Sequence, residues 1–361
     1  MVVRQAKISR ITARPVIVPL PRPITTAVGT IPNAPLVLID LHTDAGVQGS
    51  AYIFTYTTLA LAASTKLVSD IGEALVGRRL APAAITNELG GKFRLLGRQG
   101  LVGMAMSGID MAAWDAMARL HEMSVAALLG AEEVALTCYD SFGIIDPGKD
   151  RDALEKSLRR GFGAIKIKIG GGPVEKDLRA LDFVRDVVGP GVRLMVDYNQ
   201  SLSAPEARRR IALLSEKHRL DWVEEPVGAE DFEGHRTVRV HSSVPIQSGE
   251  NWWMPEGAAA AMAQGISDHA MLDIMKIGGI TGWMQAAALA AQHSMPVSSH
   301  IFMEASAHAL AATPNRYLLE HLDKASPILM EPVEVKDGTV TPKGPGLGMS
   351  WNEEAAKRFA A

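Results

Sequence analysis

The first part of the chain combines short strand-like runs with longer helix-like runs. Three runs are rich in β-branched and aromatic residues and are separated by Pro, Gly and Asp, which predicts a three-stranded meander; they are residues 7–19, 35–42 and 47–54. Apolar residues then recur at helical spacing over about residues 57–76 and again over about 99–120. Together these patterns predict a small α+β domain.

From about residue 134 the pattern changes to short apolar runs that alternate with amphipathic helical stretches. The runs are residues 135–139, 164–169, 193–198, 221–224, 245–248, 270–274, 295–298 and 316–319. Such runs separated by helices are typical of parallel strands that close into a barrel. The residues after the last run return to strand-like sequence rich in Gly and Pro.

These patterns divide the chain into three parts. We expect an α/β protein with an α+β domain in residues 1–130, a (β/α) barrel of the modified TIM type in residues 131–327, and a C-terminal segment in residues 328–361. A length of 361 residues suits two domains. The C-terminal segment is therefore expected to pack back on the first domain.

Nearly every apolar run of the barrel ends in a polar or charged residue. These residues are Ser141, Lys166 and Lys168, Asp197 and Asn199, Glu224 and Glu225, Glu250, Asp273 and Lys276, His300, and Glu320. The carboxyl ends of barrel strands share one face, so these side chains should converge on one pocket. One polar residue at a strand end is usually an ordinary surface group, but its recurrence along successive strands predicts an active site.

Three of the strand-end residues are carboxylates on adjacent strands, namely Asp197, Glu224 and Glu250. Their charges repel one another unless a cation lies between them. Without Cys or His among them, an all-oxygen site favours Mg²⁺, with Mn²⁺ as a substitute. The alternative is that these carboxylates form structural salt bridges with nearby lysines.

Other strand-end residues have the properties of acids and bases. Lys166 and Lys168 alternate on one strand and so point to the same face, where two ammonium groups lower each other's pKa and make one a candidate base. His300 follows a neighbouring strand whose end carries Asp273, a carboxylate that can orient the imidazole and raise its basicity. Glu320, kept protonated in a dry setting, could donate a hydrogen bond to a developing oxyanion.

Composition excludes several classes of function. The net charge of −3 gives no reason to expect nucleic acid or an anionic membrane surface as a partner. Cys138 is the only cysteine, which fits a reducing cytoplasm. The N-terminal apolar stretch is broken by Arg14, Pro15 and Pro19, so it lacks the continuous core of a signal peptide, and no run is long enough to span a membrane. We expect a cytoplasmic enzyme that acts on a small molecule.

Longer motifs carry a family resemblance along nearly the whole chain. In the first domain they are Thr26-Ala-Val-Gly-Thr30, Pro35-Leu-Val-Leu-Ile-Asp40 and Gly108-Ile-Asp-Met-Ala-Ala-Trp-Asp115. In the barrel they are Lys166-Ile-Lys168, Val196-Asp-Tyr-Asn-Gln200, Trp222-Val-Glu-Glu-Pro226, Gly249-Glu-Asn-Trp252, Asp273, Lys276-Ile-Gly-Gly279, Ser298-Ser-His300 and Ala307-His-Ala-Leu-Ala-Ala-Thr-Pro314. With these motifs in this order, the chain resembles the enolase superfamily and, within it, the mandelate racemase subgroup.

The resemblance implies a role for each of the strand-end residues. It implies an enolase-like barrel with an N-terminal capping domain, and a Mg²⁺ site formed by Asp197, Glu224 and Glu250. Lys168 would be the base for one enantiomer, and His300, oriented by Asp273, the base for the other. The implied reaction is racemisation through a metal-stabilised enediolate, and the family also implies a homo-oligomer.

The resemblance also implies how the substrate carboxylate is held. Lys166 would bind one side of that carboxylate and Glu320 would form a hydrogen bond with its other oxygen. Asn199 and Ser141 would contact polar groups of the substrate.

Apolar side chains point to the substrate class. The expected lid and pocket residues are Ile24, Val28, Ile31, Tyr52, Phe54, Leu95, Ile301 and Leu322. Such a pocket suits a phenyl ring better than a sugar chain, whose hydroxyls would lack partners. We therefore expect racemisation of mandelate or a close aryl 2-hydroxy acid. The alternatives are an acid-sugar dehydratase that uses the same metal and bases, and a non-catalytic binding protein on the same fold.

Overall fold

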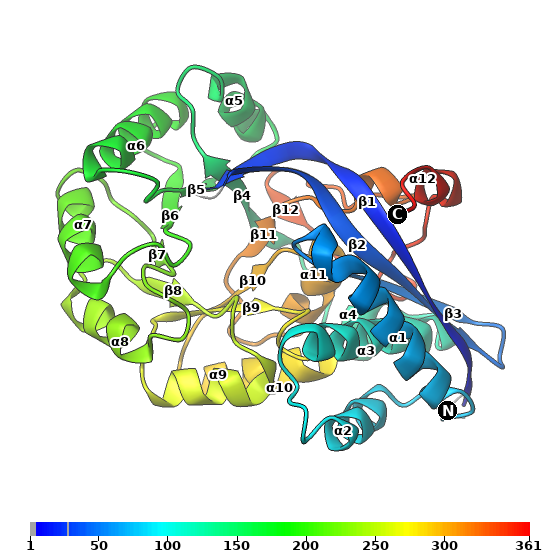
Figure 1. Ribbon diagram of the computed structural model, residues 1–361. Helices are drawn as coiled ribbons and strands as arrows, with labels where there is room; N and C mark the ends of the chain where they lie inside the picture. The colour runs from blue at the N-terminus through cyan, green and yellow to red at the C-terminus, as the bar shows by residue number, and fades with distance from the viewer. Residues whose placement is uncertain (1–4, 27–28) are drawn as a thin grey trace.

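The computed structural model describes residues 5–26 and 29–361, and Figure 1 shows a barrel beside a separate sheet and helices. The N-terminal part is an antiparallel sheet in the order β1–β2–β3, with β1 (Ile8–Thr26), β2 (Gly29–Thr43) and β3 (Gln48–Phe54). The meander is thus present, but its first two strands are longer than the sequence indicated. Their extra length forms a hairpin that reaches from this sheet towards β4 and β5 of the barrel (Figure 1).

Prolines explain why the sequence pattern predicted a shorter first strand than the structure has. Pro19 and Pro21 interrupt the strand-like sequence, but β1 lies at the edge of the sheet, where β2 is its partner strand and the bridge to the C-terminal segment at Val16 comes before these prolines. A residue without an N–H is tolerated where no partner strand needs it. The register shifts between Pro19 and Ile24, after which the strands pair again from Ile24 opposite Ile31.

Helices cover this sheet. They are η1 (Thr58–Ala60), α1 (Leu61–Leu75), α2 (Pro82–Lys92), α3 (Gly100–Leu120) and α4 (Val125–Leu128). The two predicted helices are present as α1 and α3. Helix α2 was not predicted, because its sequence contains two glycines and shows no clear apolar period. Helix α3 lies so close to β3 that a Cβ at Gly49 would lie 2.1 Å from the carbonyl oxygen of Ala112.

The remaining strands form the barrel. Its parallel strands are β4 (Leu136–Ile144), β5 (Ala164–Lys168), β6 (Arg193–Asp197), β7 (Val223–Glu224), β8 (Ile246–Ser248), β9 (His269–Asp273), β10 (Val297–His300) and β11 (Leu319–His321). They follow one another around the barrel in chain order. The ring closes where the Tyr317 N–H donates to the Val297 carbonyl at 2.7 Å and β11 pairs with β4.

Helices surround the barrel on the outside (Figure 1). They are α5 (Arg151–Arg159), α6 (Val174–Val188), α7 (Ala204–Lys217), α8 (Phe232–His241), α9 (Met254–Ala263), α10 (Gly279–Gln292) and α11 (Met303–Ala311). Buried Tyr139 of β4, Met195 of β6, Met271 of β9 and Trp222, which directly precedes β7, form a cluster. The barrel is therefore filled, and its chemistry must lie at the strand ends.

After β11 the chain leaves the barrel through η2 (Ser326–Ile328), β12 (Thr339–Val340) and α12 (Glu353–Arg358). This segment contacts the N-terminal sheet: the Ile17 N–H donates to the Phe359 carbonyl at 2.8 Å, and the Trp351 indole donates to Asp40 at 2.6 Å. Figure 1 places α12 beside β1.

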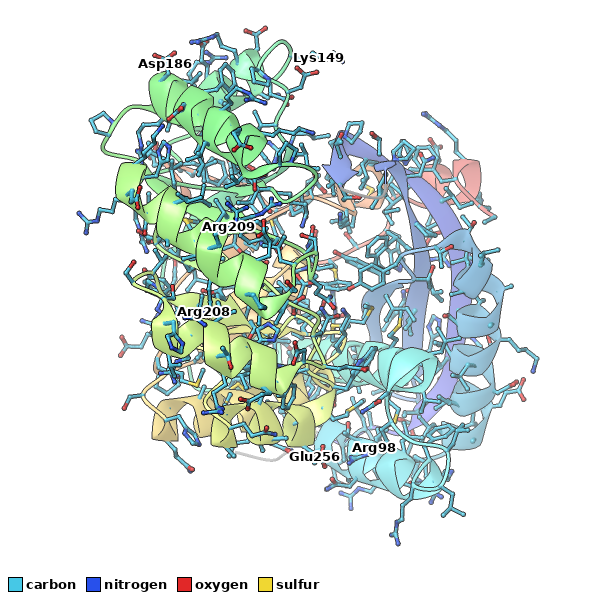
Figure 2. All side chains as sticks on the ribbon, turned by 60° about the vertical axis from the view of Figure 1, so that its left-hand side comes forward. Arg98, Lys149, Asp186, Arg208, Arg209 and Glu256 are labelled. Atoms are coloured by element: carbon cyan, nitrogen blue, oxygen red, sulfur yellow. The ribbon has the colours of Figure 1, made fainter. Side chains whose placement is uncertain are left out.

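Direct contacts also join the N-terminal helices to the barrel. The buried Asp110 carboxylate accepts hydrogen bonds from the Thr281 backbone at 2.9 Å and from its hydroxyl at 2.5 Å. Arg98 and Glu256 form an ion pair of 2.6 Å across the junction (Figure 2). None of the described helices is both long and apolar enough to cross a membrane.

Candidate active site

Three carboxylates meet at the mouth of the barrel. Asp197 ends β6, Glu224 ends β7, and Glu250 lies just beyond β8. One oxygen from each lies within 4.8 Å of the others, and all three side chains are at least largely buried. The strand pairing of Asp197 with Glu224 explains why these residues, distant in sequence, become neighbours. This donor set can hold a hard divalent cation.

Two lysines on β5 contact the same carboxylates. The Lys166 amine lies 2.6 Å from Glu224 and 3.0 Å from Glu320, and the Lys168 amine lies 2.5 Å from Asp197. The salt bridges considered as the alternative to a metal site are therefore present. Burial alone would lower the pKa of each lysine, but the carboxylates outweigh it and raise both pKa values. The charge of Lys166 does lower the pKa of Lys168, as predicted, but the anionic partners outweigh this effect, so the net shift is upward rather than towards a neutral base.

The lysines relieve the crowding of the carboxylates only in part. Burial and the neighbouring carboxylates raise the pKa of Glu224 to about 7, although Lys166 opposes the shift. Burial and the charges of Glu250 and Asp197 raise the pKa of Glu225 well above its usual value. Burial and neighbouring negative charge thus make Glu224 and Glu225 easier to protonate than free carboxylates.

A histidine and an aspartate form a pair on the next strands. His300 of β10 lies opposite Asp273 of β9 in the register, and their Nδ1 and Oδ2 atoms are 2.6 Å apart. The Nε2 atom lies 3.2 Å from Glu250. Burial lowers the pKa of His300, but Glu250 and Asp273 outweigh this effect and raise it. The expectation that an acidic neighbour raises the basicity of this imidazole is confirmed.

The protonation state of Glu320 differs from the expectation. Its carboxylate accepts a hydrogen bond from the Ile301 backbone N–H at 2.8 Å and contacts the Lys166 amine. Burial would raise its pKa, but Lys166, His300 and this N–H lower it to about 2. Glu320 is therefore ionised here rather than protonated, because it is surrounded by donors.

A cavity of about 280 Å³ opens above these groups. It is lined by Ile24, Thr26, Ile31, Phe54, Tyr56, Lys168, Asn199, Glu250, His300, Ile301, Leu322 and Lys324. The β1–β2 hairpin supplies Ile24 and Ile31, as expected of a lid. Asn199 also lines the cavity while donating its side-chain amide to Asp197 at 2.9 Å.

Some predicted pocket residues lie elsewhere. Val28 lies outside the described residues. Tyr52 does not line the cavity; it is buried, and its hydroxyl donates to Glu304 at 2.7 Å. Ser141 is buried in β4 and does not line the cavity either. Leu95 is fully exposed, so its assignment to the pocket is wrong. Apolar character alone could not separate a cavity wall from core or from surface.

Sequence reasoning missed Lys324. This residue follows β11 and lines the cavity, although it is only 4 % exposed. Its position, four residues after Glu320, was the available signal, but a lysine in a loop is ordinarily solvated.

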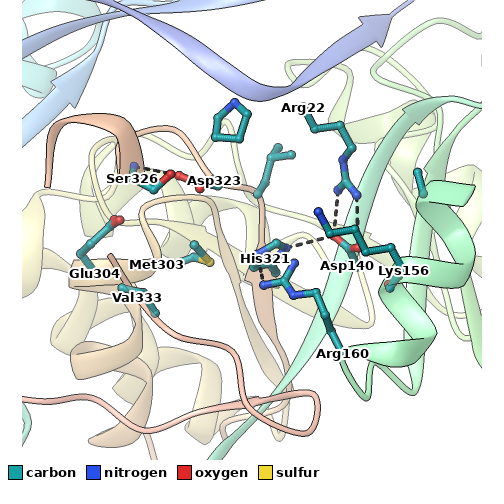
Figure 3. Close-up of a pocket in the computed structure, with 14 residues that line it drawn as sticks. Arg22, Asp140, Lys156, Arg160, Met303, Glu304, His321, Asp323, Ser326 and Val333 are labelled. Atoms are coloured by element: carbon teal, nitrogen blue, oxygen red, sulfur yellow. Dashed lines mark hydrogen bonds and ion pairs between the residues drawn. The ribbon is translucent and has the colours of Figure 1, made fainter. Parts of the chain in front are cut away.

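A second pocket, of about 340 Å³, lies beside the first and shows how the hairpin is attached (Figure 3). Arg22 of β1 contacts Asp140 of β4 through both terminal nitrogens, at 2.7 and 3.2 Å. His321 lies 3.0 Å from the same carboxylate and 3.2 Å from Arg160. Arg22 also donates to the Ser141 carbonyl at 2.6 Å. These contacts hold the hairpin against the barrel next to the cavity.

Comparisons with known proteins agree with this architecture. The family model "Mandelate racemase / muconate lactonizing enzyme, N-terminal domain" matches residues 9–130, and "Enolase C-terminal domain-like" matches residues 149–355. The structure of an enolase from Bradyrhizobium complexed with magnesium and mandelic acid aligns over 100% of both chains, with 49% identity and a TM-score of 0.97.

Two curated relatives act on other substrates. The L-talarate/galactarate dehydratase of Salmonella typhimurium is 33% identical over 266 residues, which cover 73% of this chain and 67% of the dehydratase. The D-galactarolactone cycloisomerase of Agrobacterium fabrum is 33% identical over 287 residues, which cover 73% of this chain and 75% of the cycloisomerase.

Proposed function

This chain belongs to the enolase superfamily, within the mandelate racemase and muconate lactonizing enzyme family, and from that membership we propose that it is a Mg²⁺-dependent racemase of mandelate or a closely related aryl 2-hydroxy acid. The reaction would remove the α-proton of the substrate and return a proton to either face of that carbon. Its relatives include enzymes that act on carboxylates of other kinds, so the proposal depends on the details of this site.

One observation carries the proposal: two basic side chains line a single cavity from opposite sides. Lys168 lies on β5 and His300 on β10, and β4 and β11 lie between these strands on the shorter way around the barrel. A carbon bound in the cavity would present one face to each base. Racemisation needs this arrangement, whereas removal of a proton from one enantiomer needs a single base.

The donor set fits a magnesium ion. Asp197, Glu224 and Glu250 offer only oxygen ligands, one oxygen of each lies within 4.8 Å of the others, and burial together with the neighbouring carboxylates raises the pKa of Glu224. When bound, Mg²⁺ would supply the positive charge that neutralises these carboxylates and stabilises charge developing on the substrate carboxylate. The Bradyrhizobium structure, which contains magnesium and mandelic acid, supports the same assignment.

The remaining polar groups would hold the substrate and the protons. Lys166 is fully buried and charged, and can bind a substrate carboxylate that displaces part of its contact with Glu224 or Glu320. Asp273 fixes the Nδ1 side of His300, so that Nε2 faces the cavity and exchanges the proton. Asn199 lies at the cavity wall and can donate to a substrate hydroxyl.

The walls of the cavity favour an aryl substrate. Ile24, Ile31, Phe54, Ile301 and Leu322 supply the apolar part of the cavity lining. The hydroxyls of a sugar chain would lose their hydrogen bonds to water against this surface without replacing them.

Dehydration of an acid sugar is the second candidate, because the curated relatives include an acid-sugar dehydratase. It would use the same metal and bases, but one conjugate acid would protonate a departing β-hydroxyl. Such a reaction forms a 2-keto acid, which racemisation does not.

Polarimetry separates these functions. We expect solutions of (R)- and (S)-mandelate each to lose their rotation in the presence of MgCl₂ without 2-keto acid formation, and to keep it after exhaustive dialysis against EDTA. Persistent rotation of both enantiomers with Mg²⁺ would contradict the proposal. Formation of a 2-keto acid from an acid sugar by the same preparation would then support the dehydratase.

A further inference from the structure

Lys324 is a buried amine in the cavity for which the proposed reaction has no role. It lies in the segment that follows β11, is 4 % exposed, and lines the same cavity as Lys168 and His300. Among the residues that the structure describes, Lys324 donates no hydrogen bond and forms no ion pair. The other charged groups of this cavity, Lys168, Glu250 and His300, all have ionic partners.

The surroundings of Lys324 do not explain its burial. Its amine lies 5.2 Å from the centre of the Phe54 ring, a contact that offsets only part of the cost of desolvating an ammonium group. Glu320 and Asp323 act on it at longer range, while Lys168 and Arg22 repel it, and burial dominates to lower its pKa to about 7. An amine that lines a cavity in a largely buried side chain, without a hydrogen-bond partner from the protein, is available to donate to a ligand bound there.

The position of the amine indicates which part of a substrate it would meet. The amine lies over the Phe54 ring, and Phe54 belongs, with Leu322, to the apolar lining that would surround the aryl ring. The substrate carboxylate is assigned to the metal site and Lys166, deeper at the strand ends. Lys324 therefore faces the ring rather than the reacting carbon. A single donor in an apolar wall suits one oxygen on a ring better than the many hydroxyls of a sugar acid.

We propose that Lys324 determines specificity by donating a hydrogen bond to an oxygen on the aryl ring, so that the preferred substrate is a ring-hydroxylated mandelate rather than mandelate itself. This inference rests on the proposed racemase function and adds the substrate class. A ring hydroxyl accepts the bond from the amine, and the loss of such a hydrogen bond in a dry site costs roughly ten- to a hundredfold in selectivity.

The test compares substrates of equal size that differ in the acceptor. Values of kcat/KM are measured for 3- and 4-hydroxymandelate against 3- and 4-methylmandelate, with mandelate and 4-carboxymandelate alongside. We expect the wild-type enzyme to prefer the hydroxyl over the methyl group by about ten- to a hundredfold at one ring position. In the Lys324→Met variant this preference should disappear or invert. Racemisation of mandelate and of the methyl compounds should still be measurable. Lys324→Gln keeps a donor and should restore part of it.

Lys149→Met is the matched control, because the Lys149 side chain is 81% exposed. It should keep the wild-type selectivity, and thermal unfolding should show that all variants fold. An equal preference for hydroxyl and methyl compounds in the wild-type enzyme, or a preference that survives Lys324→Met, would overturn the inference. Stronger preference for 4-carboxymandelate would also overturn it, in favour of a second carboxylate. If none of the mandelates loses its rotation, the proposed function itself fails, and this inference with it.

Discussion

At the scale of single residues, the site contains acids and bases whose positions could be predicted and residues whose strained backbone could not. The acids and bases could be predicted because barrel topology brings all the strand ends to one face, whatever the details of packing. Backbone strain could not be predicted: Asn199, Glu225 and Ile301 have φ values of 43°, 35° and 39°. Such conformations cost about 1–3 kcal/mol each and persist where the surrounding structure imposes them. Ionisation states were also unpredictable, since Glu320 and both β5 lysines depend on partners from other strands.

Glu224 offers a test of the metal site at this scale. Glu224→Gln keeps the shape of the side chain but removes an anionic ligand. We expect Mg²⁺ affinity measured by calorimetry to fall steeply and kcat/KM to fall on the order of a hundredfold. The metal-free variant should unfold at the same temperature or higher, because a carboxylate crowded by others is replaced by a neutral amide. Glu233→Gln on exposed α8 is the control, and unchanged Mg²⁺ binding by Glu224→Gln would contradict the assignment.

At the scale of elements, the β1–β2 hairpin shows where sequence patterns stop being informative. The prolines of β1 indicated an end near residue 19, yet the strand continues to Thr26 because no strand of the sheet pairs with the outer edge at these prolines. Pairing with β2 and the contact of Arg22 with Asp140 hold the continuation in place. The strands of the barrel were easier to predict, because each is a short apolar run buried on both faces.

Gly143 provides a test of the hairpin. A Cβ at this position would lie 2.5 Å from the carbonyl oxygen of Thr25, so Gly143→Ala must displace the hairpin. Because Ile24 and Ile31 line the cavity, we expect kcat/KM for the aryl substrate to fall about ten- to a hundredfold with little loss of Mg²⁺ affinity. Gly163→Ala is the matched control, since its Cβ would meet nothing within 4 Å. Equal kinetics for the two variants would show that the hairpin does not cover the substrate.

At the scale of the whole molecule, buried polar residues join the parts of the chain. Asp110 fixes α3 to α10, and Asp115 accepts hydrogen bonds from Ser50 of the N-terminal sheet and Leu347 of the C-terminal segment, at 2.8 and 2.5 Å. The sequence predicted that the last segment turns back towards the first domain. It could not predict these contacts, because a polar residue on a helix is usually solvated and these partners lie 65 to 232 residues away along the chain.

Buried His308 should make the stability of the folded protein depend on pH. It is 1 % exposed in α11, its Nδ1 atom accepts the Ala126 N–H at 3.2 Å, and burial lowers its pKa to about 4. Between pH 6.5 and 4 the unfolded chain therefore holds more protons at this residue than the folded one. The free energy of unfolding should fall by about 3 kcal/mol over this range because of His308.

Urea unfolding between pH 7 and pH 4 measures this effect. His308→Asn, whose side-chain oxygen can accept the same bond, should show a shallower loss of stability as the pH falls than the wild-type protein. His293→Asn on the exposed end of α10 should match the wild-type slope. A slope unchanged by His308→Asn would show that this histidine is protonated equally in both states.

Exchange of the α-proton in D₂O tests the two-base mechanism most directly. In the His300→Asn variant, Lys168 still lines one side of the cavity, while the opposite side lacks a base. Proton NMR should therefore show that one enantiomer of mandelate, expected to be (S), exchanges its α-proton for deuterium without racemising, and that the other enantiomer keeps its proton. A Lys168→Met variant should show exchange only for the other enantiomer. Exchange of both enantiomers, or of neither, by His300→Asn with Mg²⁺ bound would contradict the mechanism.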